Sequence, residues 1–403
     1  MLAALFPLHR DLDAWLLHPL WGRALFAVLL YGLFFLAYTL TEWPMELIDG
    51  ALASLAQWLN SQLPTSEWTR LLVEGIVPGV AAVLVFLPTV ASVFVGLAVL
   101  EHSGYLQRAA QLFAPLMARF GLPGQALLSL ALGFGCNVPS VLSAQSLPRG
   151  AQRTALLLSA PLMSCSARLP VYVLLAAACF KDNAVLVILA VHAWGVALAL
   201  GLSWFISRKQ APTLIAVQPS LSPMQVPSVG QVFGDAYRHS SDFLRKIGQV
   251  ILLGAMLIWF LQSYPANEQG ELQGPSYLEQ AGQVLSPVTA PLNFTWQDNV
   301  ALLSGLVAKE VIVSTMVMTR NLPSVDGDDD AQTLGWAGAL SQQMSPSQAL
   351  AFMLFTLLYF PCLATLGTLR RLGGWRLPLM SMGFGLTTAW LSAYAVTLIG
   401  AWL

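Results

Sequence analysis

Residues 133–143 read GFGCNVPSVLS, a run with two glycines, a cysteine, an asparagine and a proline inside an otherwise apolar region. Glycine and proline both interrupt helices, because glycine adopts many backbone conformations and proline lacks the amide proton. Non-helical backbone at membrane depth is tolerated only where it is buried in protein or lines a water-filled cavity. If this region lies in a bilayer, the run therefore predicts a functional break in a helix.

The composition indicates a membrane protein. Of the 403 residues, 56% are hydrophobic and 10% are charged, whereas a soluble domain carries about 25% charged residues. The net charge of −1 argues against a nucleic-acid partner, which requires an excess of Lys and Arg. Apolar stretches that are long enough to cross the hydrocarbon core recur along the chain. We predict seven spans, at about 21–41, 75–101, 154–180, 184–206, 245–264, 347–368 and 377–401.

Two further apolar stretches, at about 124–146 and 298–320, are interrupted. We expect each of them to enter and leave the membrane on the same side. With that assumption, successive spans cross the membrane in alternating directions. Most basic residues then lie at the cytoplasmic ends of the spans, and most acidic residues lie at the outer ends. The exceptions are Arg70, Lys181 and Arg320. The same count predicts a cytoplasmic N-terminus.

The two halves of the chain repeat each other. Residues 104–143 align without gaps to residues 276–315, at an offset of 276 − 104 = 172. The identical positions in this register include tyrosine, glutamine and proline, which are not common filler in membrane helices. Among the identical pairs are Tyr105 and Tyr277, Pro115 and Pro287, and Gly133 and Gly305.

Two copies that enter from opposite faces form an inverted-topology repeat, whose substrate site lies near the midplane at broken helices. We therefore predict an all-α polytopic membrane protein with an inverted repeat, two re-entrant hairpins and broken transmembrane helices. A polar connection with four prolines, at 207–240, separates the first half from the second. The predicted halves are 1–206, with a first break region at about 124–180, and 241–403, with a second at about 298–368.

Side chains suited to a metal ion fall at these breaks. Cys136 and Asn137 lie in the first interrupted stretch, and Lys309 and Glu310 lie at the matching place in the second. Thiolates are soft ligands whereas carboxylate and amide oxygens are harder, so a mixed set suits a borderline ion such as Fe(II) or Mn(II). The predicted metal ligands are Cys136, Asn137, Cys165, Glu310 and Cys362. The predicted pathway residues are Gly133, Gly135, Pro139, Ser164, Arg168, Lys309 and Pro361.

Each of these residues also has a plainer interpretation. A lone buried cysteine often only packs, and Lys309 and Glu310 could simply neutralise each other. Asn137 and Ser164 could cap helix ends. Arg168 could satisfy freed carbonyls, repel cations or anchor the cytoplasmic side. We interpret the fourth cysteine, Cys179, as structural, and we expect no disulfides because all four cysteines lie in or beside apolar segments.

Four segments resemble the paired gate motifs of the bacterial ferrous iron transporter B: GFGCNVP, APLMSCSARLPVY, LLSGLVAKEVIVST and LLYFPCLATL. The similarity extends to LLHPLWG and ELIDG near the start, to LLVEGIVPGVAAVLVFLP, and to FLRKIGQVIL after the polar connection. The resemblance implies a multi-pass permease of the bacterial cytoplasmic membrane whose transported substrate is Fe(II). It implies no enzymatic activity and no cofactor bound by a recognisable motif.

Several features depart from that family. Its members usually begin with a G-protein domain, but this sequence contains neither the phosphate loop GxxxxGK[ST] nor the guanine-specifying NKxD. His102 replaces the usual acidic residue after Glu101, and the connection lacks a Leu-Pro-Pro-Tyr-like stretch. We therefore expect that this chain does not bind GTP by that route. The partner stays open and could be a separately encoded GTPase or a small cytoplasmic accessory protein. The chain could also form a homo-oligomer. Transport could instead proceed down a gradient or by coupling to another ion.

Other functions also stay open at this stage. A manganese permease would use much the same ligands. A nucleoside or organic-ion carrier has similar gate segments, but it needs a roomy pocket with aromatic and amide side chains rather than three thiols. A membrane scaffold or sensor that transports nothing would tolerate replacement of Cys136 and Glu310. No pair of acid and base and no nucleophile constellation indicates an enzyme.

Overall fold

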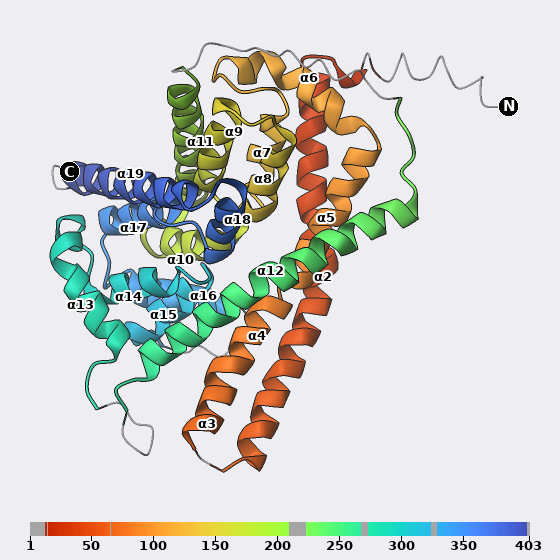
Figure 1. The fold of residues 1–403 in the computed structure, drawn as a ribbon. Helices are drawn as coiled ribbons and strands as arrows, with labels where there is room; N and C mark the ends of the chain where they lie inside the picture. Colours follow the sequence, from red (N-terminus) through yellow and green to blue (C-terminus); the bar gives the residue numbers. More distant parts are fainter. Residues whose placement is uncertain are drawn as a thin grey trace. The chain divides into compact units, whose positions relative to one another are not determined.

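The computed structural model describes residues 13, 15–64, 66–208, 223–266, 273–323 and 329–400. Throughout these ranges the chain forms helices and turns and contains no β-strand, which confirms the predicted all-α class (Figure 1). The chain divides into two compact units. Unit 1 comprises 1–132, 143–156 and 201–253, and unit 2 comprises 133–142, 157–200 and 254–403. Each unit therefore contains segments from both halves of the sequence.

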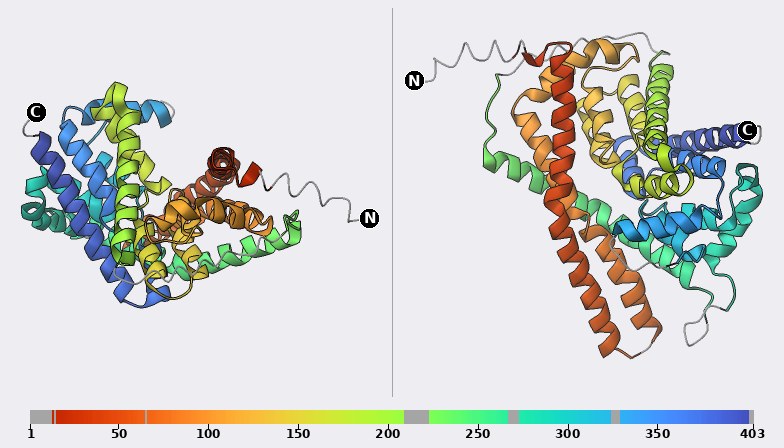
Figure 2. Two further views of the ribbon diagram at one scale, coloured as in Figure 1. Left: turned by 90° about the horizontal axis from the view of Figure 1, so that it is seen from above. Right: turned by 180° about the vertical axis from the view of Figure 1, so that it is seen from behind.

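The first unit is built on one very long helix. Helix α2 (Trp21–Gln62) has 42 residues and is about 63 Å long at 1.5 Å per residue, twice the thickness of the hydrocarbon core. We predicted a span that ends at about 41, but the helix continues past Pro44 into the acidic segment that follows. Helices α4 (Val77–Leu84) and α5 (Leu87–His102) pack along α2 (Figures 1 and 2).

The predicted continuous span at 75–101 is wrong in detail, because the chain is broken there. A short helix α3 (Glu67–Arg70) leads into a π-helical turn, η2 (Leu71–Ile76), and then into α4 and α5. A proline stands in the first turn of both α4 and α5, where its missing amide proton costs no hydrogen bond. Helix α5 and α6 (Tyr105–Ala118) then form a pair bent by 82° at Gly104.

Two helices pass from one unit into the other. Helix α11 (Ala184–Arg208) matches the predicted span at 184–206. Helix α12 (Val229–Ser263) begins inside the predicted polar connection, of which residues 209–222 lie outside the described part. Only its segment Gly248–Ser263 is apolar, and this is shorter than a full span.

The second unit contains the breaks. Helix α10 (Leu169–Cys179) packs against helices α15, α16 and α17, and α17 packs closely along α19 (Figure 1). The predicted breaks near Pro161 and Pro361 are confirmed, because the apolar segments there are divided into shorter helices. These are α9 (Ala151–Ser159), η4 (Ala160–Leu162), η5 (Ser166–Arg168) and α10 at the first break, and α17 (Pro346–Leu358) and α18 (Leu363–Gly373) at the second.

The other helices of unit 2 are α8 (Asn137–Ser143), α13 (Tyr277–Thr289), η7 (Ala290–Leu292), α14 (Trp296–Ser304), α15 (Val311–Thr319), α16 (Asp329–Leu340) and α19 (Arg376–Gly400). The sequence repeat is visible in their boundaries. Helix α13 begins at Tyr277 and α6 begins at Tyr105, which reproduces the offset of 277 − 105 = 172. Helix α7 (Ala126–Leu132) ends before Gly133, and α14 ends before the matching Gly305.

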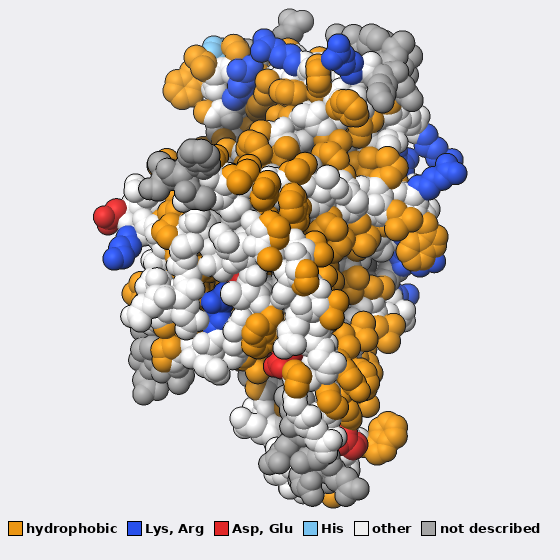
Figure 3. Space-filling view, turned by 90° about the vertical axis from the view of Figure 1, so that its left-hand side faces the viewer, with side chains coloured by type: hydrophobic (Ala, Val, Ile, Leu, Met, Phe, Trp, Pro, Cys, Tyr) orange, Lys and Arg blue, Asp and Glu red, His pale blue; other side chains and the backbone are white. Residues whose placement is uncertain are grey.

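The apolar helices confirm a polytopic membrane protein. Five segments in the described part of the chain are long and apolar enough to cross a membrane, and the bent α5–α6 pair could be a sixth. Hydrophobic side chains are spread over the face drawn in Figure 3, as expected of a surface that contacts lipid. The five segments are Trp21–Gln62, Ala151–Cys179, Lys181–Arg208, Pro346–Gly373 and Arg376–Gly400.

Candidate functional site

The second interrupted stretch folds back on itself as a helical hairpin. Helix α14 packs against α15, and the hydroxyls of Ser304 and Thr315 hydrogen-bond across the pair at 2.8 Å. At the open end, Arg320 Nη2 lies 2.6 Å from a carboxylate oxygen of Asp298. The chain therefore enters and leaves this hairpin at the same end, as expected from the charge count.

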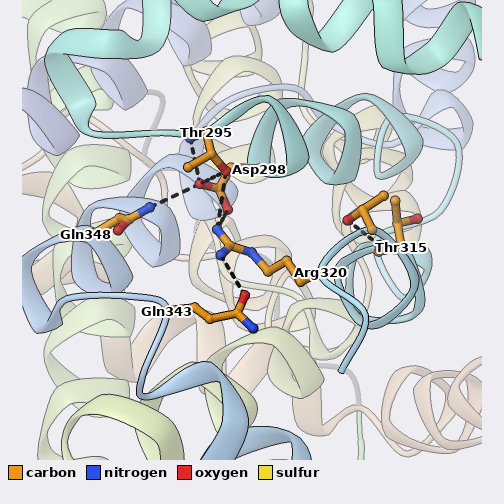
Figure 4. Close-up of polar contacts among 7 residues, drawn as sticks. Thr295, Asp298, Thr315, Arg320, Gln343 and Gln348 are labelled. Atoms are coloured by element: carbon orange, nitrogen blue, oxygen red, sulfur yellow. Dashed lines mark hydrogen bonds and ion pairs between the residues drawn. The ribbon is translucent and has the colours of Figure 1, made fainter. Parts of the chain in front are cut away.

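A buried polar network closes that end of the hairpin (Figure 4). The Asp298 carboxylate accepts hydrogen bonds from the backbone N–H of Thr295 at 2.9 Å and from Gln348 Nε2 of α17 at 3.1 Å. Arg320 Nη1 is 3.5 Å from the side-chain oxygen of Gln343. This network was not predicted from the sequence, although Arg320 was an exception to the charge rule. Its charge is paired with that of Asp298.

The first interrupted stretch also doubles back. In unit 1, the hydroxyl of Ser129 in α7 hydrogen-bonds to the hydroxyl of Ser143, the last residue of α8. Pro139 is the third residue of α8, within its first turn, where its missing amide proton costs no internal hydrogen bond.

Cys136 and Cys165 each stand directly before a helix that begins at a break. Cys136 precedes α8, and its carbonyl accepts from the N–H of Ser140. Cys165 has extended backbone, with ψ of 158°, and precedes η5, which runs into α10.

Glu310 and Cys362 occupy the same kind of position in the second half. Glu310 is the residue before α15. Cys362 is extended, with ψ of 156°, and precedes α18, where its sulfur lies 3.2 Å from the hydroxyl of Thr365. The free N–H groups and the dipole at a helix N-terminus favour negative charge. All four side chains thus stand directly before a helix that begins at a break.

The four candidate ligands share one neighbourhood in unit 2. Cys136 has Cys362, Cys165 and Glu310 among its electrostatic neighbours, and Cys165 in turn has Cys362 and Glu310. Within the described ranges, no group of three or more His, Cys, Asp or Glu side chains is close enough to hold a metal ion. The ligands are therefore gathered without forming a closed coordination shell, and ligation stays a prediction.

Polar side chains satisfy the backbone at the first break and at the break that follows it. The N–H and the hydroxyl of Ser166 both donate to the carbonyl of Gly135, at 3.3 and 2.9 Å. Arg168 Nη1 donates to the carbonyl of Met163 at 2.9 Å, one of the roles considered for it from the sequence. Ser164 does not cap a helix; its hydroxyl donates to the hydroxyl of Tyr172 at 3.3 Å.

Asn137 lies among freed carbonyl groups. With its amide nitrogen turned toward them, it donates to the carbonyls of Gly133 and Ala160 at 3.3 and 3.2 Å. These contacts favour the interpretation that Asn137 stabilises the break, and its role as a metal ligand stays a prediction. At the later break, Pro361 lies between α17 and α18, directly before Cys362.

Lys309 is the most unusual side chain in this neighbourhood. It is 2% exposed, and its ammonium group makes no hydrogen bond. It lies instead over the ring of Tyr359, with Nζ 3.5 Å from the ring centroid. Lys309 and Glu310 do not form a direct ion pair, but each is an electrostatic neighbour of the other.

The cysteines are free thiols, as expected. Cys179 is the one away from the breaks, and its thiol donates to the carbonyl of Met344 at 3.6 Å. This contact fits the structural role predicted for it.

A family model matches the two break-containing regions of the chain. The model is named Gate and described as nucleoside recognition, and it matches residues 83–179 and 244–376. These ranges make up more than half of the chain and contain all four residues that stand before helices at the breaks.

Curated relatives match nearly the whole chain. It is 32% identical to the Fe(2+) transport protein A/Fe(2+) transporter FeoB fusion protein of Porphyromonas gingivalis, over 95% of this chain and 50% of the relative. It is 33% identical to Fe(2+) transporter FeoB of Methanocaldococcus jannaschii, over 94% and 57%. It is 32% identical to Fe(2+) transporter FeoB of Campylobacter jejuni, over 96% and 64%. The chain thus spans between half and two thirds of these relatives, and no solved structure matches it.

Proposed function

This chain belongs to the Gate family and is similar, over about 95% of its length, to proteins named Fe(2+) transporter FeoB; from this premise we propose that it carries Fe(II) across the cytoplasmic membrane. One structural observation carries the proposal. Cys136, Cys165, Glu310 and Cys362 each stand before a helix that begins at a break, and they share one electrostatic neighbourhood. Three soft ligands and one hard ligand suit a borderline ion such as Fe(II).

The open arrangement of these ligands suits transport. A transported ion must be bound well enough to lose water and weakly enough to leave again. Because the four side chains do not form a closed shell in this structure, a passing ion draws them together only while it is bound.

The second hairpin has a base and a tip that are held by different contacts. The Asp298–Arg320 pair holds the base together, whereas Lys309 and Glu310 lie in the turn between α14 and α15. We infer that the turn moves relative to the base when an ion passes. The first hairpin acts in the same way in the inverted repeat, so that the two turns open to opposite sides.

The proposal extends to partners and location. The relative from Porphyromonas gingivalis is named as a fusion with Fe(2+) transport protein A, which favours a small accessory protein of that kind as a partner of this chain. The N-terminus lies in the cytoplasm, in agreement with the basic residues at the predicted cytoplasmic ends.

A nucleoside carrier is the second candidate function, because the family model is described as nucleoside recognition. Three thiols and a carboxylate are poor partners for a sugar or a base, which prefer amide groups and aromatic stacking. The names of the relatives favour Fe(II) over a nucleoside.

Uptake of radiolabelled Fe(II) and Mn(II) under reducing conditions tests the proposal. The unaltered chain is compared with Cys136→Ser and Glu310→Gln, and with Cys179→Ser as the matched cysteine control. We expect Fe(II) uptake that both site variants reduce and the control retains. Uptake is measured in proteoliposomes and in cells, since cells supply any soluble partner. Fe(II) uptake that is equal in all variants would reject Cys136 and Glu310 as ligands. Absence of Fe(II) uptake, or competition by nucleosides but not by Mn(II), would reject the proposed transport.

A further inference from the structure

One histidine lies within a long apolar helix. His192 is the only ionisable residue of α11 before Arg208 at its end. Ionisable side chains inside transmembrane segments are costly, and they mark ion pathways or proton relays. His192 lies on the face of α11 that packs against protein, because Val191, Gly195 and Ala199 on the same face are buried, although the imidazole itself is only partly buried.

This face of α11 packs against the break between α9 and α10. A Cβ atom at Gly195 would meet the carbonyl oxygen of Leu162 in η4 at 2.8 Å, so the two backbones approach each other closely. The His192 ring stacks on Phe134, with the ring centroids 6.2 Å apart, and meets the edge of Tyr172 at 5.7 Å. All of these residues belong to unit 2. The imidazole is therefore held between the first interrupted stretch and helix α10.

Both aromatic neighbours belong to segments that carry a candidate ligand. Phe134 stands two residues before Cys136. The Tyr172 hydroxyl accepts a hydrogen bond from Ser164, which directly precedes Cys165. The contacts of the imidazole are thus made by the same segments that carry the two thiols of the first half.

The hydrogen bonding of the imidazole leaves one ring nitrogen available. Nδ1 of His192 lies 2.8 Å from the carbonyl oxygen of Ile188, and because a carbonyl can only accept, Nδ1 carries the proton. Nε2 makes no hydrogen bond with any residue in the described part of the chain, and in the neutral ring it keeps its lone pair. Metal-binding histidines donate their other ring N–H to a backbone carbonyl in this way, which fixes the ring and directs the second nitrogen to the ion.

An imidazole nitrogen is a ligand that suits Fe(II). We propose that His192 is a further Fe(II) ligand of this chain, through Nε2, beside the first break. This inference rests on the proposed function, and it adds a nitrogen donor to the sulfur and oxygen donors already named. No three ligand side chains of the described ranges are close together, so His192 meets the ion at one point of its passage rather than in a closed shell.

Protection of the imidazole by iron tests binding without transport. Diethyl pyrocarbonate transfers an ethoxycarbonyl group to the unprotonated imidazole nitrogen, with release of ethanol and CO₂. Tag-free protein in detergent is modified with and without Fe(II) in ascorbate, and each site is read by mass spectrometry. We expect Fe(II) to slow the modification of His192 but not of His239, an exposed histidine of unit 1 that stacks on Phe94. Mg²⁺, which prefers oxygen ligands, should slow neither.

Variants at position 192 test the part of this ligand in transport. His192→Phe removes the nitrogen and keeps an aromatic ring between Phe134 and Tyr172, whereas His192→Cys offers a thiol. We expect His192→Phe to raise the Fe(II) concentration for half-maximal uptake about tenfold, which corresponds to about 1.4 kcal/mol, and His192→Cys to restore part of the affinity. The matched control, His239→Phe, keeps the unaltered value. A purely structural role would instead lower the maximal rate or Tm.

The outcomes separate this inference from the proposed function. If the unaltered chain carries iron, but iron leaves the modification of His192 unchanged or His192→Phe keeps the unaltered half-saturation, the inference is overturned and the function stands. Equal protection of His192 and His239, or a lowered Tm of His192→Phe without a change in half-saturation, would also overturn it. If the unaltered chain carries no iron in liposomes or cells, the proposed function fails, and the inference fails with it.

Discussion

Asp298 and Arg320 form a buried ion pair of 2.6 Å that joins the first turn of α14 to the residue after α15. The Asp298 carboxylate also accepts hydrogen bonds from Thr295 and Gln348, so its remaining lone pairs are satisfied. A buried ion pair contributes to a single defined structure when its partners are satisfied in this way, but removal of one partner leaves an uncompensated charge. The pair therefore fixes the base of the second hairpin.

Replacement of Arg320 should be strongly destabilising. We expect Arg320→Met to lower the free energy of unfolding by about 3–5 kcal/mol, because the Asp298 carboxylate stays buried without its counter-charge. Thermal unfolding of the purified protein in detergent measures the change. The control is Arg70→Gln, since Arg70 is a partly exposed residue 3.8 Å from Glu67, and a pair of this kind contributes less than about 1 kcal/mol.

A double variant separates the ion pair from general damage at this position. In Asp298→Asn/Arg320→Met no charge is left buried, so we expect the loss to be smaller than the sum of the two single losses. Residues in direct contact show such coupling, whereas independent sites are additive. Additive losses would mean that the two side chains stabilise the hairpin separately.

Hydropathy predicted the spans that are uniformly apolar and missed features set by other forces. The helices Ala184–Arg208 and Arg376–Gly400 begin and end within a few residues of the predicted spans. Helix α2 continues beyond its predicted end because polar residues and one proline do not stop a helix that packs against neighbours. The span at 75–101 is divided because two prolines each begin a new helix.

The candidate site was predictable where it depended on local sequence. The repeat located both breaks, because glycine and proline act on the backbone close to their own positions. The contacts of Arg320 and Lys309 were not predictable in this way. Arg320 meets Asp298 in the other arm of its hairpin, and Lys309 meets Tyr359, which lies in a different helical segment. Such contacts depend on how the hairpin closes and packs.

The close approach of α19 to the break after α17 gives another prediction. A Cβ atom at Gly385 would collide with the backbone carbonyls of Leu358 and Tyr359. We expect Gly385→Ala to destabilise the protein by about 1–3 kcal/mol, since backbone atoms cannot move aside as side chains can. Gly383, two residues earlier in α19, has open space around it. Gly383→Ala should therefore be neutral or stabilising by up to about 1 kcal/mol, and equal effects at both positions would contradict the predicted contact.

The contact between α5 and α12 should depend on pH. His102 Nε2 lies 2.7 Å from a carboxylate oxygen of Asp235, which also pairs with Arg238. These hydrogen bonds, first that of His102, lower the pKa of Asp235 below its ordinary value of 3.8. A lowered pKa in the folded state means that the stabilisation is present near neutral pH and is lost as the pH falls through that pKa.

Asp235→Asn provides the comparison for this pH dependence. We expect the unaltered protein to be only slightly more stable than the variant near pH 7, because Asp235 is partly exposed and its pairs are screened by solvent. The difference should shrink as the pH is lowered below about 4. Thermal unfolding of both proteins over this range measures it, and a difference that grows toward acid pH would have the wrong sign.

Protection of the thiols by iron tests directly whether these cysteines coordinate Fe(II). Cys136, Cys165 and Cys362 are partly buried free thiols, so a small membrane-permeant maleimide should label them slowly in the absence of metal. Coordination uses the thiolate that the maleimide attacks. Fe(II) should therefore slow the labelling of these three residues, as read site by site by mass spectrometry. Mg²⁺, a hard ion that prefers oxygen ligands, should not.

Cys179 makes this experiment internally controlled. It is also a partly buried free thiol, but its contact is with the carbonyl of Met344 rather than with the candidate ligands. Its labelling rate should be unchanged by Fe(II). Slower labelling of all four cysteines would indicate a general closing of the protein around the ion rather than coordination by three of them. Unchanged labelling of Cys136, Cys165 and Cys362 would mean that these thiols only pack at the breaks, and that Glu310 alone meets the ion.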